Sequence, residues 1–186
     1  MRVISGAYRG KNLSAPKGLS TRPTSDRVRE ALFNILSSRI DFAGISVLDI
    51  CAGTGSLGIE AISRGAIACC FIEYSLSVKP ILLKNLTVTG CTEKAEILTM
   101  DAVKALQNIS LNSKCFDLIF FDPPYDSELY KPVLEALDTH KFLTHGSTLV
   151  VECSSRKPLL EFYGCMKRFD RRVYGETALD FFALEE

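Results

Sequence analysis

The chain has 186 residues, of which 47% are hydrophobic and 24% charged, a composition ordinary for one soluble globular domain. No apolar stretch approaches the ~18 residues of a membrane span, and the N-terminus lacks an apolar core of signal-peptide length, so we expect a cytoplasmic protein. The seven cysteines include no Cys-x-x-Cys pair, which argues against a metal site and indicates small buried hydrophobes in a reducing compartment.

The net charge is zero, but the charges are unevenly distributed. Residues 1–40 carry eight Lys or Arg against two acidic residues, and the remaining 146 carry 14 basic and 20 acidic residues. A second basic cluster near the C-terminus consists of Arg156, Lys157, Lys167, Arg168, Arg171 and Arg172. This asymmetry indicates a polyanion bound by one part of the surface, rather than general coating of nucleic acid.

The first 44 residues form an N-terminal extension. Two short β-like pieces, Arg2–Ile4 and Asn12–Ala15, flank a glycine-bounded turn and predict a hairpin or an extended arm. Thr24 or Ser25 then caps a helix over Asp26–Ser38, whose apolar residues recur at helical spacing.

From residue 45 to residue 186 we expect a second unit in which strands and helices alternate. Strands are expected at Ser46–Ile50, Ala68–Glu73, Ala95–Thr99, Phe116–Phe121 and Thr148–Cys153. Helices are expected at Ser56–Arg64, Ser77–Thr89, Ala102–Asn108 and Leu129–Thr139. This rhythm predicts an α/β fold, a mostly parallel twisted sheet with helices on both faces. After Pro158 we expect a short helix and then an antiparallel strand pair, Lys167–Tyr174 and Ala178–Leu184.

A glycine-rich loop, Gly53-Thr54-Gly55-Ser56-Leu57-Gly58, follows the first strand of this unit. Gly53 and Gly55 allow a tight bend and a close approach to a ligand, and Gly58 allows the helix to pack closely on a strand. The spacing also fits a nicotinamide dinucleotide. Asp49 argues against that interpretation, because a pyrophosphate requires a helix end free of carboxylates. A carboxylate at this place suits a ligand with a cationic amino group instead.

Acidic residues follow the next three strands as well. Glu73 is placed to accept hydrogen bonds from ribose hydroxyls, Asp101 from the exocyclic amine of adenine, and Asp122 lies at the end of the fourth strand. Each alone is compatible with a plain helix cap or loop acid. Together with Asp49 they predict one acid-lined crevice, which suits a nucleoside with an amino-acid tail, S-adenosylmethionine.

The tetrapeptide Asp122-Pro123-Pro124-Tyr125 ends the fourth predicted strand. The prolines fix the turn before any ligand arrives. The acid accepts a hydrogen bond from an amino group, and the aromatic ring supplies a stacking face. The tetrapeptide therefore predicts a site for a flat ligand that carries an NH2 group.

These motifs resemble those of class I methyltransferases that modify exocyclic amines of nucleobases, with a Rossmann-like fold. The segments Arg2–Gly10, Arg22–Glu30 and Leu48–Gly55 narrow the resemblance to the bacterial 16S rRNA guanine-N2 methyltransferase family, RsmD, over essentially the whole chain. The resemblance implies methylation of a guanine N2 amine in 16S rRNA of the small ribosomal subunit or an assembly intermediate. It implies S-adenosylmethionine as the cofactor and no metal, and we expect a monomer.

The resemblance also implies roles for single residues. The cofactor is expected at Thr24, Asp49, Gly53, Gly55, Glu73, Asp101 and Ala102. The catalytic residues are expected to be Asp122, Pro123 and Tyr125, with the target base flipped onto the tyrosine ring. RNA is expected to contact Arg2, Tyr8, Arg9, Lys11, Arg22, Arg27 and Arg29, although some helix arginines there could only pair with Asp26 or Glu30.

Other acceptors and other classes of protein remain open at this point. The tetrapeptide alone does not separate guanine N2 from adenine N6 in DNA or RNA, or from a glutamine amide in protein, because all present a planar NH2 group. A nicotinamide-dependent oxidoreductase would use the same glycine loop. A non-enzymatic RNA-binding module would have no use for an acid-lined crevice.

Overall fold

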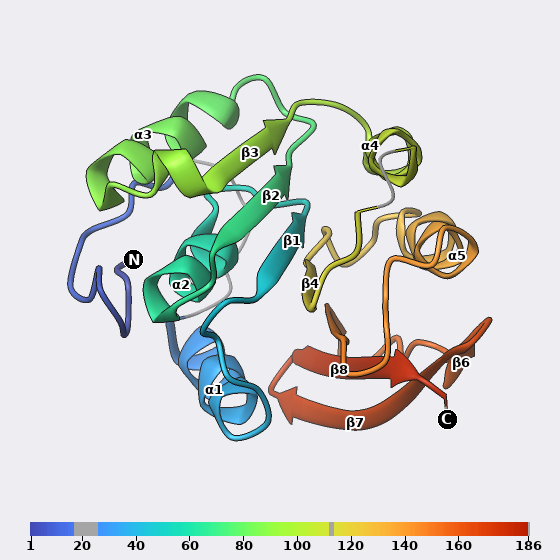
Figure 1. The fold of residues 1–186 in the computed structure, drawn as a ribbon. Coiled ribbons are helices and arrows are strands. Elements are labelled where there is room, and N and C mark those ends of the chain that lie inside the picture. The colour runs from blue at the N-terminus through green and yellow to red at the C-terminus, as the bar shows by residue number, and fades with distance from the viewer. Residues whose placement is uncertain (17–25, 112–113, 186) are drawn as a thin grey trace.

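The computed structural model describes residues 1–16, 26–111 and 114–185 (Figure 1). The strands are β1 (Ser46–Ile50), β2 (Ala68–Ile72), β3 (Ala95–Leu98), β4 (Leu118–Phe121), β5 (Thr148–Ser154), β6 (Phe162–Tyr163), β7 (Met166–Tyr174) and β8 (Thr177–Leu184). The helices are α1 (Asp26–Ser37), α2 (Ser56–Arg64), α3 (Lys79–Thr89), α4 (Ala102–Ser110) and α5 (Tyr130–Thr139), with the 3-10 turn η1 (Thr92–Lys94). The predicted alternation of strands and helices is confirmed, with ends that shift by one or two residues.

All strands belong to one sheet, in the order β3-β2-β1-β4-β5-β8-β7-β6. β1 to β5 are parallel, and β8, β7 and β6 continue the sheet in antiparallel fashion. The mostly parallel sheet and the C-terminal antiparallel pair are therefore confirmed. The strand order reverses at β1, because β2 and β3 lie on one side of it and β4 and β5 on the other. Since these strands are parallel, their carboxyl ends share one edge of the sheet.

Helices cover both faces of the sheet, as Figure 1 shows. Successive strand residues point to opposite faces, so Val47 packs with α1, α2 and α3, whereas Leu48 packs with α4 and α5. Both apolar cores are fully buried, which explains why the strands are continuous apolar runs rather than alternating ones. Within the described residues, no helix is both long enough and apolar enough to cross a membrane.

The N-terminal arm, residues 1–16, lies against α2 and α3 on the first face (Figure 1). Its two ends are bridged in antiparallel fashion between Arg2 and Asn12, so the predicted hairpin is present in outline. Ile4 N–H and Ser5 N–H donate to the carboxylate of Glu60 in α2, at 2.7 and 3.0 Å. Val3 and Leu13 enter the same core as α1. The arm is therefore held by the body of the protein.

The prediction of a short helix after Pro158 is wrong. Phe162–Tyr163 instead forms β6, which pairs with β7 across a turn at Gly164 and Cys165. Asp138 of α5 accepts a hydrogen bond from Cys165 N–H at 2.7 Å, and a side-chain carbon at Gly164 would lie 1.8 Å from the same carboxylate. The apolar residues of this segment are compatible with either a helix or a strand. Hydrogen bonding to β7 makes the segment a strand.

Candidate active site

The carboxyl ends of β1, β2 and β4 are joined by backbone hydrogen bonds that continue beyond the strands. Asp122 N–H donates to Ile50 O at 3.3 Å, and Ala52 N–H donates to Ile72 O at 2.9 Å. The loops that leave these strands therefore start side by side, at the point where the strand order reverses. Open α/β sheets bind ligands at this place.

The loop after β1 turns sharply into α2. Gly53 and Gly55 have φ angles of 54° and 77°, and Cys51 has a φ of 62°, a left-handed conformation that only glycine adopts without strain. A side-chain carbon at Gly58 would lie 2.4 Å from the ring of Phe71 in β2. The predicted role of Gly58 in close packing between helix and strand is thus confirmed.

Asp49 lies under this loop and not in an open crevice, because the residue is only 1% exposed. Its Oδ2 atom accepts a hydrogen bond from Gly58 N–H at 2.9 Å, which fixes the first turn of α2. Burial raises the pKa of Asp49 to about 7; the Gly58 bond lowers this pKa and the charge of Glu73 raises it further. The sequence did not indicate this bond between Asp49 and the helix.

Glu73 and Asp101 also bind backbone N–H groups. Glu73 accepts from Gly53 N–H through Oε2 and from Ser75 N–H through Oε1, both at 2.7 Å. Asp101 caps α4 by accepting from Lys104 N–H at 3.1 Å, directly before Ala102. A carboxylate offers about four acceptor sites, so these bonds leave acceptor capacity for a ligand.

Two of the four predicted acids bind the glycine loop directly, Asp49 through Gly58 N–H and Glu73 through Gly53 N–H. Burial is the main cause that raises the pKa of the Cys51 thiol in this loop to about 12, and the charges of Glu73, Asp122, Asp49 and Asp101 raise it further. All four acids lie at or shortly after the carboxyl ends of parallel strands, so they lie at the same edge of the sheet. That they line one cofactor crevice stays a prediction.

The Asp-Pro-Pro-Tyr turn lies beside this loop, with Pro123 buried and Asp122 and Tyr125 half-buried. The Tyr125 hydroxyl lies 2.9 Å from Glu152 Oε1 in β5 and 2.6 Å from Thr177 Oγ1 in β8. Burial is the main reason that the pKa of Tyr125 is raised. The sequence interpretation missed both partners, although Glu152 is the one charged residue in its strand and could have been noticed for that reason.

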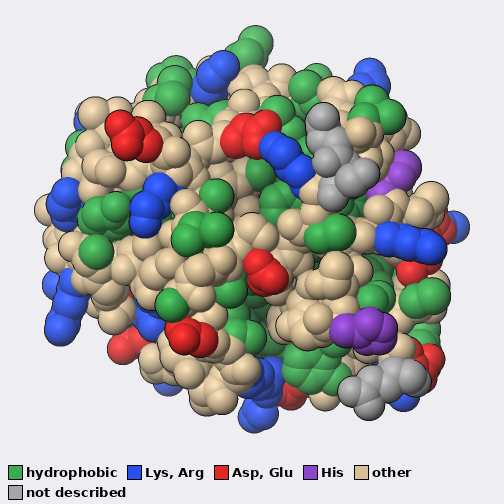
Figure 2. Space-filling view, in the orientation of Figure 1, with side chains coloured by type: hydrophobic (Ala, Val, Ile, Leu, Met, Phe, Trp, Pro, Cys, Tyr) green, Lys and Arg blue, Asp and Glu red, His purple; other side chains and the backbone are tan. Residues whose placement is uncertain are grey.

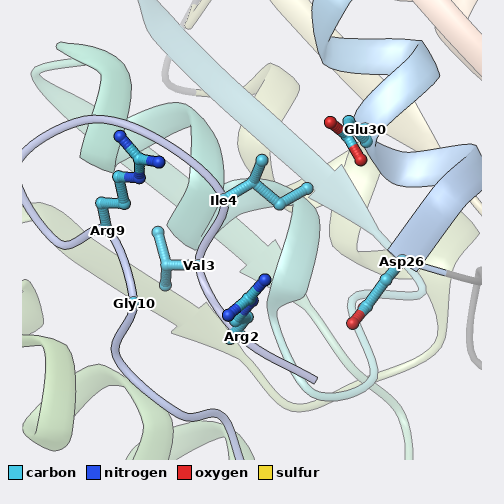
Figure 3. Close-up of a pocket in the computed structure, with 7 residues that line it drawn as sticks. All are labelled: Arg2, Val3, Ile4, Arg9, Gly10, Asp26 and Glu30. Carbon is cyan, nitrogen blue, oxygen red and sulfur yellow. The ribbon is translucent and has the colours of Figure 1, made fainter.

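Arg2 and Arg9 are exposed on the N-terminal arm, and Arg27 is exposed at the start of α1. Figure 3 shows Arg2 and Arg9 at a cavity of about 250 Å³ between the arm and α1, which Asp26 and Glu30 also line. These three arginines remain available to a ligand outside the protein. Arg22 and Thr24 lie outside the described residues.

Two other predicted RNA contacts have partners within the protein. Arg29 has no exposed surface, and its Nη2 atom donates to Arg2 O and Asp26 Oδ1 at 2.5 and 3.1 Å. The predicted RNA contact of Arg29 is therefore wrong, because this side chain cannot reach a phosphate. Lys11 donates to Val88 O and Thr89 O at the end of α3, and its ammonium lies 5.3 Å from the centre of the Tyr8 ring.

Each residue of the second basic cluster lies near a carboxylate. Arg168 and Arg171 pair with Asp180, which has no exposed surface. The other pairs are Arg156–Glu176, Lys157–Asp126, Lys167–Glu185 and Arg172–Asp170. Figure 2 shows one face of the molecule, on which basic and acidic side chains are interspersed.

Comparison with known proteins points to one family. The family model described as "Conserved hypothetical protein 95" matches residues 1–183. Bacillus subtilis YlbH, named for a proposed rRNA methyltransferase activity, is 36% identical over 96% of this chain and 96% of its own length. The ribosomal RNA small subunit methyltransferase D of Haemophilus influenzae is 36% identical over 86% of this chain and 82% of its own length.

A solved structure agrees with these relatives. The Escherichia coli protein yhhF, described as a methyltransferase candidate, superposes with a TM-score of 0.83 at 31% identity and covers 100% of this chain and 98% of its own. The fold is the Rossmann-like fold of class I methyltransferases. The chain belongs to the Conserved hypothetical protein 95 family, the RsmD family that includes the ribosomal RNA small subunit methyltransferases D.

Proposed function

We propose that this protein transfers a methyl group from S-adenosylmethionine to the exocyclic N2 amine of a guanine in 16S rRNA of the small ribosomal subunit. The observation that carries the proposal is the glycine loop held by two strand-end carboxylates, Asp49 and Glu73, beside the Asp-Pro-Pro-Tyr turn, whose Asp122 N–H binds the end of β1. The names of relatives at 35–36% identity support ribosomal RNA of the small subunit as the substrate.

This edge of the sheet has suitable groups for each part of the cofactor. The Gly53–Gly55 backbone and the charge of Asp49 suit the methionyl end, whose amino group is cationic. Glu73 suits the ribose hydroxyls, and Asp101 with the Ala102 amide suits the adenine. S-adenosylmethionine supplies an electrophilic methyl group on a sulfonium. The protein therefore has to position the nucleophilic nitrogen and stabilise the positive charge that develops on it.

The exocyclic amine is a poor nucleophile because its lone pair is delocalised into the ring. The Asp122 carboxylate and the Pro123 carbonyl can each accept one of its two hydrogens, which favours a pyramidal nitrogen with its lone pair toward the methyl carbon. Bound S-adenosylmethionine would supply the methyl group to this nitrogen, and its sulfur would keep the electron pair of the broken S–C bond. The Asp122 carboxylate then holds the proton that the nitrogen releases.

The N-terminal extension, residues 1–44, provides the RNA-binding surface, and residues 45–186 carry out the transfer. Arg2, Arg9 and Arg27 are suited to bind phosphates of the RNA backbone, and a base flipped from its stack packs on the ring of Tyr125. The substrate would be the small subunit or one of its assembly intermediates, which a cytoplasmic monomer can reach.

Labelled-methyl transfer onto small ribosomal subunits that lack the modification, followed by nucleoside mapping, tests this function. We expect label in N2-methylguanosine. Label in N6-methyladenosine or in a protein glutamine would replace the proposed acceptor, and an unlabelled particle would contradict the function. Binding of S-adenosylhomocysteine but not of NADH is expected, and the reverse would favour an oxidoreductase.

Asp122→Ala should lower kcat by at least about a hundredfold, because it removes one of the two acceptors that orient the amine. Affinity for S-adenosylhomocysteine should change by no more than about twofold. Asp126→Ala is the matched control, because Asp126 is an exposed acid in the same turn whose partner is Lys157. A variant at position 122 with rapid turnover would contradict the assignment.

A further inference from the structure

The hydroxyl of Tyr125 is held at its far end by two buried side chains from two different strands. Glu152 in β5 is 6% exposed and Thr177 at the start of β8 is 5% exposed. Their oxygens lie 2.9 and 2.6 Å from the tyrosine hydroxyl. Three side chains far apart in the sequence thus meet at one oxygen atom.

The strand pairing fixes where these two partners stand. Phe121 of β4 lies opposite Val151 of β5, so Glu152 stands beside the start of the Asp-Pro-Pro-Tyr turn. β8 runs antiparallel to β5 on its other side, with Ser154 opposite Thr177. The hydroxyl of Tyr130, from α5, donates to the backbone oxygen of Glu152 at 3.1 Å. Both partners therefore belong to rigid parts of the sheet.

A tyrosine side chain rotates about two bonds. Hydrogen bonds at its hydroxyl fix the first rotation and therefore the place of the ring. The hydroxyl oxygen lies on the axis of the second rotation, and the preference of the phenol O–H for the ring plane favours one tilt of the ring. A ring that must stack on a flat base is useful only in one orientation, and misplacement at a reacting centre lowers the rate steeply. Buried hydrogen bonds to a carboxylate and to a hydroxyl hold the ring without covering its faces. A phenylalanine at position 125 would supply the same ring face but not this restraint.

We propose that Glu152 and Thr177 are positioning residues, which hold the ring of Tyr125 at the place where the target base stacks on it. The inference rests on the proposed function and adds a role for β8, the C-terminal strand that follows the parallel part of the sheet. Neither residue touches the reacting atoms in this account. Both act through the tyrosine hydroxyl.

The test is a double-mutant cycle measured by methyl transfer to small ribosomal subunits. Tyr125→Phe and Thr177→Val should each lower kcat about five- to tenfold, with KM for the particle and affinity for S-adenosylhomocysteine little changed. The double variant should be no slower than the slower single variant, because both changes remove the same contact. Thr177→Ser, which restores a hydroxyl, should recover most of the rate.

Matched controls remove similar groups elsewhere in the same sheet. Tyr163→Phe removes a hydroxyl whose partner is the Leu160 backbone, and Thr148→Val changes a buried threonine at the opposite end of β5. Both should keep the wild-type kcat. If either control loses as much rate as Thr177→Val, general damage to the sheet explains the loss and the proposal is overturned.

The outcomes separate this inference from the function on which it rests. A wild-type protein that transfers no methyl group to the particles overturns the proposed function and the positioning role together. An active wild type whose Thr177→Val and Tyr125→Phe variants keep full kcat overturns only the positioning role. Additive losses in the double variant overturn it as well, because independent effects add.

Discussion

The chemistry of Asp49 is strongly altered by its surroundings. It is buried, it holds the first turn of α2 through Gly58 N–H, and its pKa is raised to about 7. Burial of a carboxylate without a cation disfavours its charged form. In the proposed enzyme the cost of burying this charge is offset when the ligand brings a cationic amino group. Asp49 therefore destabilises the ligand-free protein and stabilises the complex with the ligand.

Asp49→Asn should therefore stabilise the protein at pH 8. An acid whose pKa is raised on folding contributes stability below its unfolded pKa and loses it as pH rises through the folded pKa. The free energy of unfolding of the wild type should fall between about pH 4 and pH 7 as Asp49 ionises. The Asp49→Asn variant should show no such fall, because asparagine does not ionise. At pH 8 the gain should be on the order of 2–4 kcal/mol in the free energy of unfolding, measured by urea denaturation.

Cofactor affinity should depend on the same ionisation. Because the pKa lies at about 7, the affinity for S-adenosylhomocysteine should rise roughly tenfold between pH 6 and pH 8. Asp49→Asn should bind weakly at both pH values, with no such rise. Calorimetric titration measures both, and a wild-type affinity that does not change with pH would show that the Asp49 charge is not used.

Among the helices and strands, α2 anchors the N-terminal arm through Glu60 and Ser63, and the carboxylate of Glu60 is the charged part of this joint. Glu60 is 1% exposed, accepts from Ile4 N–H and Ser5 N–H, and pairs with Arg64 at 2.9 Å. One side chain thus satisfies two backbone donors of the arm and one guanidinium of its own helix. The position of the proposed RNA-binding surface depends on this joint.

Glu60→Ala should destabilise the protein by about 2–4 kcal/mol, because it leaves partly buried donors unsatisfied and removes the partner of a largely buried arginine. Amide hydrogen exchange of residues 3–8 should accelerate more than that of β1. Glu135→Ala, at an exposed acid of α5 that pairs with Lys131, is the control and should change stability by less than about 0.5 kcal/mol. Unchanged exchange in the arm would refute the anchoring role.

The elements themselves were largely predictable, because their apolar residues follow the periods of buried strands and amphipathic helices. The failure at Phe162–Tyr163 has a specific cause. A short apolar segment does not distinguish helix from strand. Its state depends on pairing with β7 across a two-residue turn and on Asp138, which is distant in the sequence.

At the scale of the whole molecule, the two basic regions of the sequence differ in their availability. The C-terminal cations form ion pairs within the chain, two of them with the buried Asp180. Arg2 and Arg9 are exposed on the arm, at a cavity that Asp26 and Glu30 also line, and neither arginine forms an ion pair with another of the described residues. A polyanion should therefore bind on the arm side. The composition of the sequence alone would count both regions equally.

Arg9→Ala should weaken binding of ribosomal RNA and reduce the slope of log K against log salt by about one, the expectation for one lost phosphate contact. Arg156→Ala and Arg172→Ala, whose partners are Glu176 and Asp170, are the matched controls and should leave RNA affinity unchanged. Filter binding over a salt series measures all three. Equal losses at all three positions would mean that the RNA-binding surface extends over both regions.

The parallel sheet, the glycine loop, the acids at the strand ends and the Asp-Pro-Pro-Tyr turn could be predicted from the amino-acid sequence, because they depend on local periodicity and on residues that are adjacent in the chain. Three features follow from the packing of distant segments instead: Arg29 is buried, Asp49 holds the first turn of a helix, and Glu152 and Thr177 meet at the Tyr125 hydroxyl. Burial and pairing of side chains depend on which distant segments pack together, and the chemistry of a single residue does not contain that information.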